Sequence, residues 1–454
     1  MLDFIKDIDL GFKIPTPDKT IKVAVTGMSR SGKTVFLTSL INQLLANDKL
    51  PYLNDKLKRK FVARLLPPDS VYMRFDYYNK LNGFRKADPV WPKSTKAVSK
   101  TTVQLEFKSE YAFLENQVIN LEFIDYPGEW LLDLAMLDMS FKEWSEFMLK
   151  LAKEKKRAEF SKEWFFDLNQ HSLYTNGDLQ EIEVQLFDLY SEYLKNLYYH
   201  NYSFVQPGRF VEPGDMKGDP LLIFSPLPTP EDGKYEDESI YAHFEKRYNS
   251  YVQEVVKRLY LEHFRQFDTQ IILIDLVKTL NEGEAVFEDM HLSLKSILKT
   301  FTYGSNNIFS KFFDLKIDHV LFAATKADHI PSSQHESYKR LLEEMIWDMK
   351  MELDVKHIDT EVTIFSSVKS SKFVKAKLDG IEVDCIRGTV LGESEPSTHF
   401  PGILPNDYKD QNFWKEADFH FVTFKPISFP PRDTSAVEHI RMDRLIYSLL
   451  KDRV

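Results

Sequence analysis

The chain has 454 residues, of which 43% are hydrophobic and 28% are charged. This composition is typical of globular proteins, so extensive disorder and fibrous repeats are excluded. At roughly 150 residues a domain, the length predicts about three units, or one body with large insertions. Phe (35) and Tyr (21) are plentiful and Gly (16) is scarce, which favours helical layers packed by aromatic side chains.

Charge and cysteine content indicate which partners and which cellular compartment to expect for the protein. The net charge is −10, so the surface as a whole lacks the positive field that attracts nucleic acid, and we expect no nucleic-acid partner. The single Cys385 cannot form an intramolecular disulfide, and residues 1–20 contain no apolar signal region. No stretch reaches the roughly 18 apolar residues of a transmembrane segment. We therefore expect a cytoplasmic protein, with any membrane association peripheral.

Strand-like and helix-like segments alternate along the chain, which indicates an α/β fold with a parallel sheet. Residues 54–91 are polar and contain Pro breaks, so we expect helices joined by turns there. The predicted strands are 21–26, 101–107 and 118–124 (adjacent and antiparallel), 270–275, 319–324, 361–365, 381–387 and 419–424. The predicted helical regions are 35–45, 130–204, 240–264 and 435–450.

A glycine loop follows the first predicted strand. Gly27-x-x-x-x-Gly32-Lys33-Thr34 is a complete Walker A motif between a strand and a helix. Gly27 and Gly32 let backbone N–H groups point at phosphate oxygens, and the following helix adds its positive N-terminal end. Lys33 is expected to bridge the β- and γ-phosphates, and the Thr34 hydroxyl to bind Mg²⁺. The motif therefore predicts a nucleoside triphosphate site.

An aspartate ends the strand-like run 118–124. Asp125-x-x-Gly128 follows it, and in a P-loop sheet such an aspartate reaches Mg²⁺, usually through water. The Gly128 amide can contact the γ-phosphate and report its loss as a loop movement. The pattern therefore predicts a metal-binding Asp125 and a mobile loop at Gly128.

Two further loops follow predicted strands and suit recognition of a base. In Thr325-Lys326-Ala327-Asp328, the Asp328 carboxylate can accept hydrogen bonds from guanine N1–H and the exocyclic amine, while the Lys326 stem packs over the base. Adenine lacks this donor pair. Ser366 to Lys369 resembles the Ser-Ala-Lys loop whose backbone amide contacts the guanine oxygen. Together the loops predict a preference for guanine.

The ordered set of these motifs resembles a Ras-type GTPase. More closely, Thr26 to Thr34, Trp91-Pro92-Lys93-Ser94-Thr95 and Asp125-Tyr126-Pro127-Gly128-Glu129-Trp130 resemble the bacterial YcjX-like family, and the similarity extends over most of the chain. The resemblance implies a stress-associated GTP-binding protein that works near the envelope, with a membrane-protein partner at the inner membrane.

The fold implied is α/β, with a Ras-like P-loop NTPase sheet, large helical insertions and a C-terminal α+β extension. The GTPase core is expected at 18–50, 95–135 and 265–375, the helical insertions at 51–94 and 136–264, and the C-terminal extension at 376–454. The residues expected to contact GTP or GDP are Gly27, Ser29, Arg30, Ser31, Gly32, Lys33, Thr34, Val35, Lys326, Asp328, Ser367, Val368 and Lys369.

Ras-like proteins also need a threonine from a first switch, which meets Mg²⁺ and the γ-phosphate. Ser94, Thr95, Thr101 and Thr102 are candidates, and Thr95 is favoured because it lies in the Trp-Pro-x-Ser-Thr block and outside the predicted strand. The candidate catalytic residues are Lys33, Thr95, Gly128 and Glu129, and the candidate Mg²⁺ ligands are Thr34, Thr95 and Asp125.

Glu129 departs from the Ras pattern, because many Ras-like enzymes have a water-orienting Gln after the switch glycine. An anionic side chain there repels the γ-phosphate, so we expect slow intrinsic hydrolysis. Two alternatives stay open. A phosphotransferase would use ATP and pass its γ-phosphoryl group to a small molecule bound by the helical insertion. A non-hydrolysing scaffold would bind nucleotide only to hold its fold together.

Overall fold

The computed structural model describes residues 18–27, 31–67, 73–93, 98–109, 115–154, 156–176, 179–262, 266–302, 317–405, 413–416, 418–428 and 435–454. In this part of the chain an eight-stranded sheet has the order β2-β4-β5-β1-β6-β7-β8, with β3 paired to β4. The strands are β1 (Lys19–Gly27), β2 (Phe61–Leu65), β3 (Met73–Arg74), β4 (Ser99–Phe107), β5 (Gln117–Asp125), β6 (Thr269–Ile274), β7 (His319–Ala324) and β8 (Asp359–Ile364).

Strands β5, β1, β6, β7 and β8 run parallel, and β4 is antiparallel to β5, as the sequence predicted. All six residues of β6 and of β7 are buried, because helices cover both faces of this part of the sheet. The register aligns Val25 with Asp125 and Ile274 with Ala324. The loops that follow the parallel strands therefore leave the same edge of the sheet, where ligands bind in open α/β folds.

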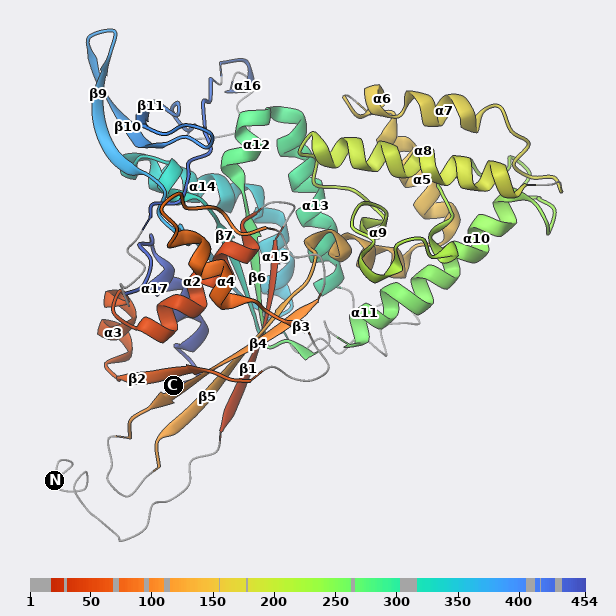
Figure 1. Cartoon of the computed structure of the whole chain (residues 1–454). Helices are drawn as coiled ribbons and strands as arrows, with labels where there is room; N and C mark the ends of the chain where they lie inside the picture. Colours follow the sequence, from red (N-terminus) through yellow and green to blue (C-terminus); the bar gives the residue numbers. More distant parts are fainter. Residues whose placement is uncertain are drawn as a thin grey trace.

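Helices lie on both faces of the sheet (Figure 1), and each face carries its own hydrophobic core. One face is covered by α2 (Lys33–Ala46), α3 (Pro51–Leu57), α4 (Tyr77–Phe84) and the C-terminal α17 (Met442–Leu450). The other face is covered by α12 (Leu276–Glu282), α13 (Glu284–Thr302), α14 (His335–Met345) and α15 (Trp347–Val355). The C-terminal helix thus completes the core beside α2.

The predicted insertion after β5 is helical and forms a lobe beside the sheet (Figure 1). Buried aromatic side chains hold it together, with Trp144 5.1 Å from Tyr248 and Trp164 stacked 5.6 Å from Tyr193 between ring centroids. A 3₁₀ segment (Gly128–Asp138) leads into it. Its elements are α5 (Phe141–Ala152), α6 (Arg157–Phe160), α7 (Lys162–Leu168), α8 (Gln180–Tyr199), α9 (Gly208–Val211), α10 (Ile240–Tyr251), a π-helical turn (Val252–Val256) and α11 (Lys257–Glu262).

A small second sheet follows the main one. It contains β9 (Lys372–Leu378), β10 (Ile381–Thr389) and β11 (Pro396–His399) in the antiparallel order β11-β10-β9. Figure 1 shows the β9–β10 hairpin extending away from the body of the protein. A short helix, α16 (Phe413–Glu416), comes between this sheet and α17.

Several sequence predictions were wrong in detail. Residues 54–91 contain strands as well as helices: β2 pairs with β4 and extends the main sheet, with Phe61 buried and Val62 exposed. The segment 419–424 is not a strand, because Phe424 makes only an isolated bridge with Val390. The last helix begins at Met442, after Arg441 takes a left-handed conformation with φ of 57°. The first turns after Gly128 are 3₁₀ and not α-helical.

Candidate nucleotide-binding site

A cavity of about 420 Å³ lies at the edge of the main sheet where the parallel strands end. It brings together loops that are hundreds of residues apart in the sequence. The predicted site residues that line it are Gly27, Ser31, Gly32, Lys33, Thr34, Val35, Gly128, Glu129, Lys326, Asp328, Ser367 and Val368. Ser29, Arg30 and Thr95 lie outside the described residues.

The phosphate loop places the start of α2 at the cavity. Gly32 has a φ of 85°, a left-handed conformation that glycine adopts without strain, and α2 begins at the next residue. The Lys33 ammonium nitrogen lies 3.1 Å from Asp125 Oδ1 and 5.5 Å from the centre of the Tyr126 ring. A helix N-terminus and a lysine charge therefore face the same space, as binding of phosphate groups requires.

Gly27 and Gly128 are in backbone contact. A Cβ atom on Gly128 would lie 1.8 Å from the Gly27 carbonyl oxygen, so no larger residue fits without movement of one loop. The loop after β5 therefore rests directly on the phosphate loop. A displacement of Gly128 therefore changes its contact with the Gly27 backbone.

Thr34 lines the cavity, and Asp125 lies behind the lining beside Lys33; their oxygen-bearing side chains fit Mg²⁺ held together with nucleotide phosphates. The Asp125 side chain is buried at the end of β5, and Thr34 lies in the first turn of α2. A hydroxyl and a carboxylate are hard oxygen ligands, and Mg²⁺ typically takes one or two carboxylates with phosphate oxygens and water. Among the described residues there is no cluster of three His, Cys, Asp or Glu side chains that would form a separate protein-only metal site.

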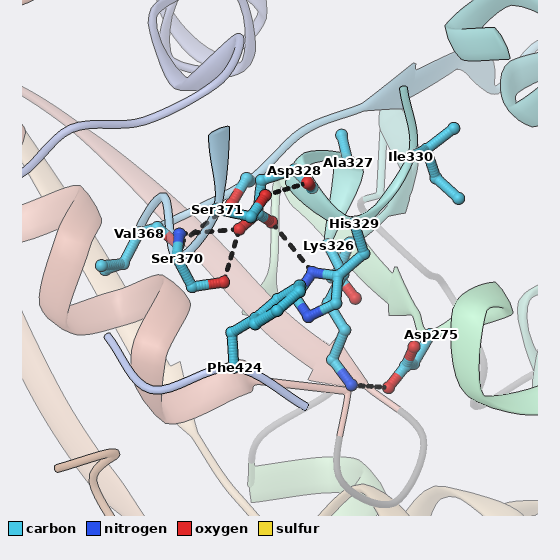
Figure 2. Close-up of polar contacts among 12 residues, drawn as sticks. Asp275, Lys326, Ala327, Asp328, His329, Ile330, Val368, Ser370, Ser371 and Phe424 are labelled. Carbon is cyan, nitrogen blue, oxygen red and sulfur yellow. Dashed lines mark hydrogen bonds and ion pairs between the residues drawn. The ribbon is translucent and has the colours of Figure 1, made fainter. Parts of the chain in front are cut away.

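The base loop is built around Asp328 (Figure 2). Asp328 Oδ2 accepts hydrogen bonds from the Ser370 backbone N–H at 2.7 Å and the Ser370 hydroxyl at 2.6 Å, and His329 Nδ1 lies 3.3 Å from Oδ1. Burial alone would raise the pKa of Asp328. The facing His329 and the hydrogen bonds from His329 and Ser370 outweigh burial and lower this pKa well below its ordinary value. The carboxylate is thus an oriented, ionised acceptor.

Lys326 is held by a carboxylate from the neighbouring strand. Its backbone is left-handed, with φ of 59°, and its ammonium nitrogen lies 2.6 Å from Asp275 Oδ2 (Figure 2). Asp275 follows β6 and caps α12, accepting a hydrogen bond from the Lys278 backbone N–H. This ion pair fixes the Lys326 stem along the cavity wall.

The loop after β8 enters the cavity through Ser367 and Val368, whereas Lys369 lies outside its lining. The Ser367 carbonyl accepts a hydrogen bond from the Ser39 hydroxyl of α2. The Lys369 backbone N–H donates to the Glu438 carbonyl at 2.8 Å, and its ammonium lies 5.8 Å from the Phe373 ring centre. Of the loop from Ser366 to Lys369, the first three residues therefore line the cavity.

The segment after Gly128 is clamped by the helical insertion. The Asp133 carboxylate is buried and accepts hydrogen bonds from the Gly208 backbone N–H at 2.7 Å and the Tyr251 hydroxyl at 2.6 Å. Burial raises the pKa of Asp133 to about 7. The Arg209 guanidinium lies 3.3 Å from the centre of the Trp130 ring. These contacts join the candidate switch segment to α9.

Sequence reasoning missed several lining residues. His329 follows Asp328 but belongs to none of the motifs, and nothing in the sequence distinguishes Ser370 among the four serines from 366 to 371. Asp275 carried a signal, because it ends a central parallel strand next to β1. No local signal marked the lining residues that come from other parts of the chain, namely Tyr198, Glu212, Thr423 and Phe424.

The sheet topology defines an α/β protein with the fold of P-loop GTPases and helical insertions. The chain matches the model of the YcjX-like family, DUF463, over residues 21–454. It is 35% identical over 458 residues to a protein named Ras-like GTPase YcjX from Escherichia coli (strain K12), with 96% of each chain covered. A protein of the same name from Shewanella oneidensis is 32% identical over 465 residues, covering 97% of this chain and 96% of that protein. The chain belongs to the YcjX-like family, which confirms the resemblance noted from its motifs.

Proposed function

We propose that this chain binds GTP and GDP with Mg²⁺, hydrolyses GTP slowly and acts as a nucleotide-controlled switch. One observation carries the proposal: a single cavity joins a Walker A loop, the Gly128 loop and a buried ionised Asp328. The names of the two relatives, both Ras-like GTPases, support the same activity.

Selectivity for guanine follows from the charge of Asp328. An ionised carboxylate only accepts hydrogen bonds, and guanine offers two adjacent N–H donors on one edge. Adenine presents an acceptor at N1, which would face the carboxylate unpaired and carry a desolvation penalty. Ser370 holds the carboxylate through two hydrogen bonds, so the acceptor is oriented before a ligand arrives.

Hydrolysis would transfer the γ-phosphoryl group to water, and Lys33 would neutralise charge that develops on the phosphate oxygens. Thr34 and Asp125 would hold Mg²⁺, which would supply positive charge to stabilise the transferring phosphoryl group. Gly128 packs against the Gly27 carbonyl, and its backbone N–H would contact the γ-phosphate. Glu129 lines the cavity and is 8% exposed, and its anionic side chain would disfavour the approach of the γ-phosphate and slow the reaction.

Switching would begin at the Gly27–Gly128 contact. A Cβ atom on Gly208 would lie 2.2 Å from the Glu129 carbonyl oxygen, so the Gly128–Glu129 backbone is confined between the phosphate loop and α9. If this backbone moves on loss of the γ-phosphate, α9 of the helical insertion would have to move with it. A partner that binds the insertion could then distinguish GTP from GDP.

The proposed biological setting is a bacterial stress- or envelope-related pathway with a protein partner, as the resemblance to the YcjX-like family implies. Within the described residues, no helix combines the length and apolarity needed to cross a bilayer. The proposal places the protein in the cytoplasm, with access to a membrane-protein partner at the inner membrane.

Phosphate release tests the enzymatic part of the proposal. Purified protein with Mg²⁺ should release phosphate from GTP and not from ATP, and Lys33→Ala should abolish release. Protease digestion with GDP or a non-hydrolysable GTP analogue should differ at the Gly128 segment. ATP turnover that depends on an added small molecule would favour a phosphotransferase. Binding without turnover or a change in digestion would favour a scaffold.

A further inference from the structure

We propose that residues 418–428, here called the C-terminal strap, form part of the nucleotide site, and that Phe424 is a positioning residue that slows release of bound guanine nucleotide. This inference rests on the proposed function. It assigns a role to a segment that follows the main sheet by more than 50 residues and carries no nucleotide-binding motif.

The strap contacts the base loop through its aromatic residue. The Phe424 ring centre lies 5.4 Å from the His329 ring centre, and His329 Nδ1 in turn lies 3.3 Å from Asp328 Oδ1. Figure 2 shows the Phe424 ring beside the His329 ring. Thr423 and Phe424 line the same cavity as Asp328 and Lys326. Phe424 therefore supports His329 in the position from which it faces the carboxylate.

Residues of the second sheet pack against the Phe424 ring. Phe424 is fully buried, and a Cβ atom on Gly388 of β10 would lie 2.7 Å from its Cδ1 atom and 2.9 Å from the Ser370 carbonyl oxygen. The His399 ring of β11 lies 5.8 Å away. Close packing at Gly388 thus joins Phe424 to the same Ser370 that orients Asp328.

Backbone hydrogen bonds fix the strap beside β10. The Leu391 N–H donates to the Thr423 carbonyl, and the Lys425 N–H donates to the Thr389 carbonyl, both at 2.8 Å. Further back, the Phe421 N–H donates to Asn281 Oδ1 of α12 at 3.1 Å. The strap is therefore held on both sides of Phe424, which limits how far the ring can move.

The strap also makes polar contacts with residues 86–91, which precede the predicted first switch. Trp91 Nε1 donates to the Phe424 carbonyl at 2.8 Å, and Trp91 lines the cavity. The Lys425 ammonium lies 3.0 Å from Asp88 Oδ1, and the Ser428 hydroxyl donates to the Lys86 carbonyl at 3.0 Å. Three polar contacts thus join two parts of the chain that are more than 300 residues apart, and one of them, from Trp91 to Phe424, is made by two lining residues of the cavity.

Opening the base end must separate Trp91 from Phe424 or move His329 away from Asp328. Either step breaks buried contacts before a bound base can leave. The strap should therefore act on dissociation of the nucleotide more than on its association, because differences among variants of one site fall mainly on the dissociation rate.

Release of fluorescent GDP, chased with excess unlabelled GDP in Mg²⁺, tests the inference. Phe424→Leu keeps an apolar side chain and the carbonyl that Trp91 uses, and should release GDP about tenfold faster, as expected for loss of a buried aromatic contact. Trp91→Phe keeps an aromatic ring, removes the N–H donor and should accelerate release several-fold, by about one lost hydrogen bond. Association rates should stay within about twofold of wild type for both variants.

Phe421→Leu is the matched control, because it makes the same substitution in the strap at a residue outside the cavity lining. Faster release in Phe424→Leu and Trp91→Phe, with wild-type release in Phe421→Leu, supports the inference. Wild-type release in both site variants, or equal acceleration in Phe421→Leu, overturns it. If Phe424→Leu does not fold, the rate of GDP release from Trp91→Phe tests the inference. Failure of the wild-type protein to retain any GDP would instead overturn the proposed function itself.

Discussion

The two ends of the cavity are built in different ways. At the phosphate end, Gly128 rests on Gly27 and the following segment is clamped to the helical insertion through Asp133 and Gly208. At the base end, side chains make the contacts: Ser370 orients Asp328, and Phe424 supports His329. Changes at the phosphate end should therefore affect the fold and the insertion as well as the ligand. Changes at the base end should affect selectivity and release with less effect on folding.

The largest expected effect comes from the phosphate end. Lys33→Ala removes the positive charge that faces the phosphates, and nucleotide affinity should fall by about a thousandfold or more, because charged hydrogen bonds to phosphate are lost. Fluorescent GTP-analogue binding measures this loss. Lys375→Ala, at an exposed ion pair with Glu382, is the control and should bind as wild type does. Tight binding by Lys33→Ala would contradict the assignment of the phosphate loop.

Asp133 should make stability depend on pH. Its pKa is raised to about 7, so between pH 4 and pH 7 the folded protein holds a proton that the unfolded chain has released. The free energy of unfolding should therefore fall as the pH rises through this range, by at most about 4 kcal/mol. Asp133→Asn has no titrating group and should lack this contribution.

Urea unfolding of both proteins across this pH range checks the sign. The difference between them isolates Asp133 from the other titrating groups. Burial raises the pKa of the neighbouring Tyr251 well above its ordinary value, so this hydroxyl stays protonated below pH 7. A difference that does not change with pH would show that Asp133 is ionised in the folded protein.

Gly128→Ala tests the backbone contact at the phosphate end. The added Cβ atom would meet the Gly27 carbonyl, so we expect destabilisation of about 3 kcal/mol together with weaker nucleotide binding. Gly83→Ala in α4 has its nearest contact at 3.3 Å and should change the free energy of unfolding by less than about 1 kcal/mol. Wild-type stability and affinity in Gly128→Ala would mean that the two loops do not touch in solution.

Asp328→Asn should affect the base end alone. An amide presents one donor and one acceptor, which suits xanthine better than guanine, so GDP affinity should fall about a hundredfold and xanthosine diphosphate affinity should rise. Competition against fluorescent GDP and fluorescent xanthosine diphosphate measures both. Unchanged selectivity would remove the case for this loop as the base site.

The smallest expected effect concerns Glu129. Glu129→Gln removes the negative charge near the γ-phosphate and supplies an amide that can orient water, so single-turnover GTP hydrolysis should accelerate about three- to tenfold. GDP affinity should change little, since GDP has no γ-phosphate. A slower variant would show that the carboxylate assists the reaction.

The phosphate end was largely predictable from the sequence, because Gly27 to Thr34 are contiguous and each type of residue has a local geometric reason. The roles of His329 and Ser370 were not predictable from the sequence, because they depend on how the loops that follow β7 and β8 meet. The support from Phe424 depends on a segment that makes one isolated bridge and no regular strand.

The sequence indicated β2 and the buried Asp133 only weakly. β2 was missed because basic residues at 58–60 precede it, although its residues alternate between the buried and more exposed sides. Asp133 stands in the apolar run from Trp130 to Leu134, and a charged group in such a run indicates a buried partner. The partners themselves, Gly208 and Tyr251, could come only from the folded arrangement.

Competition binding tests the central claim most directly. Unlabelled GDP, GTP, ADP and ATP would each displace fluorescent GDP from the wild-type protein in Mg²⁺. The guanine nucleotides should displace it at least about a hundredfold more effectively than the adenine nucleotides, the discrimination expected when a buried carboxylate would be left unpaired. Equal displacement by ADP, or preference for adenine, would contradict the assignment of Asp328 and with it the proposed GTPase.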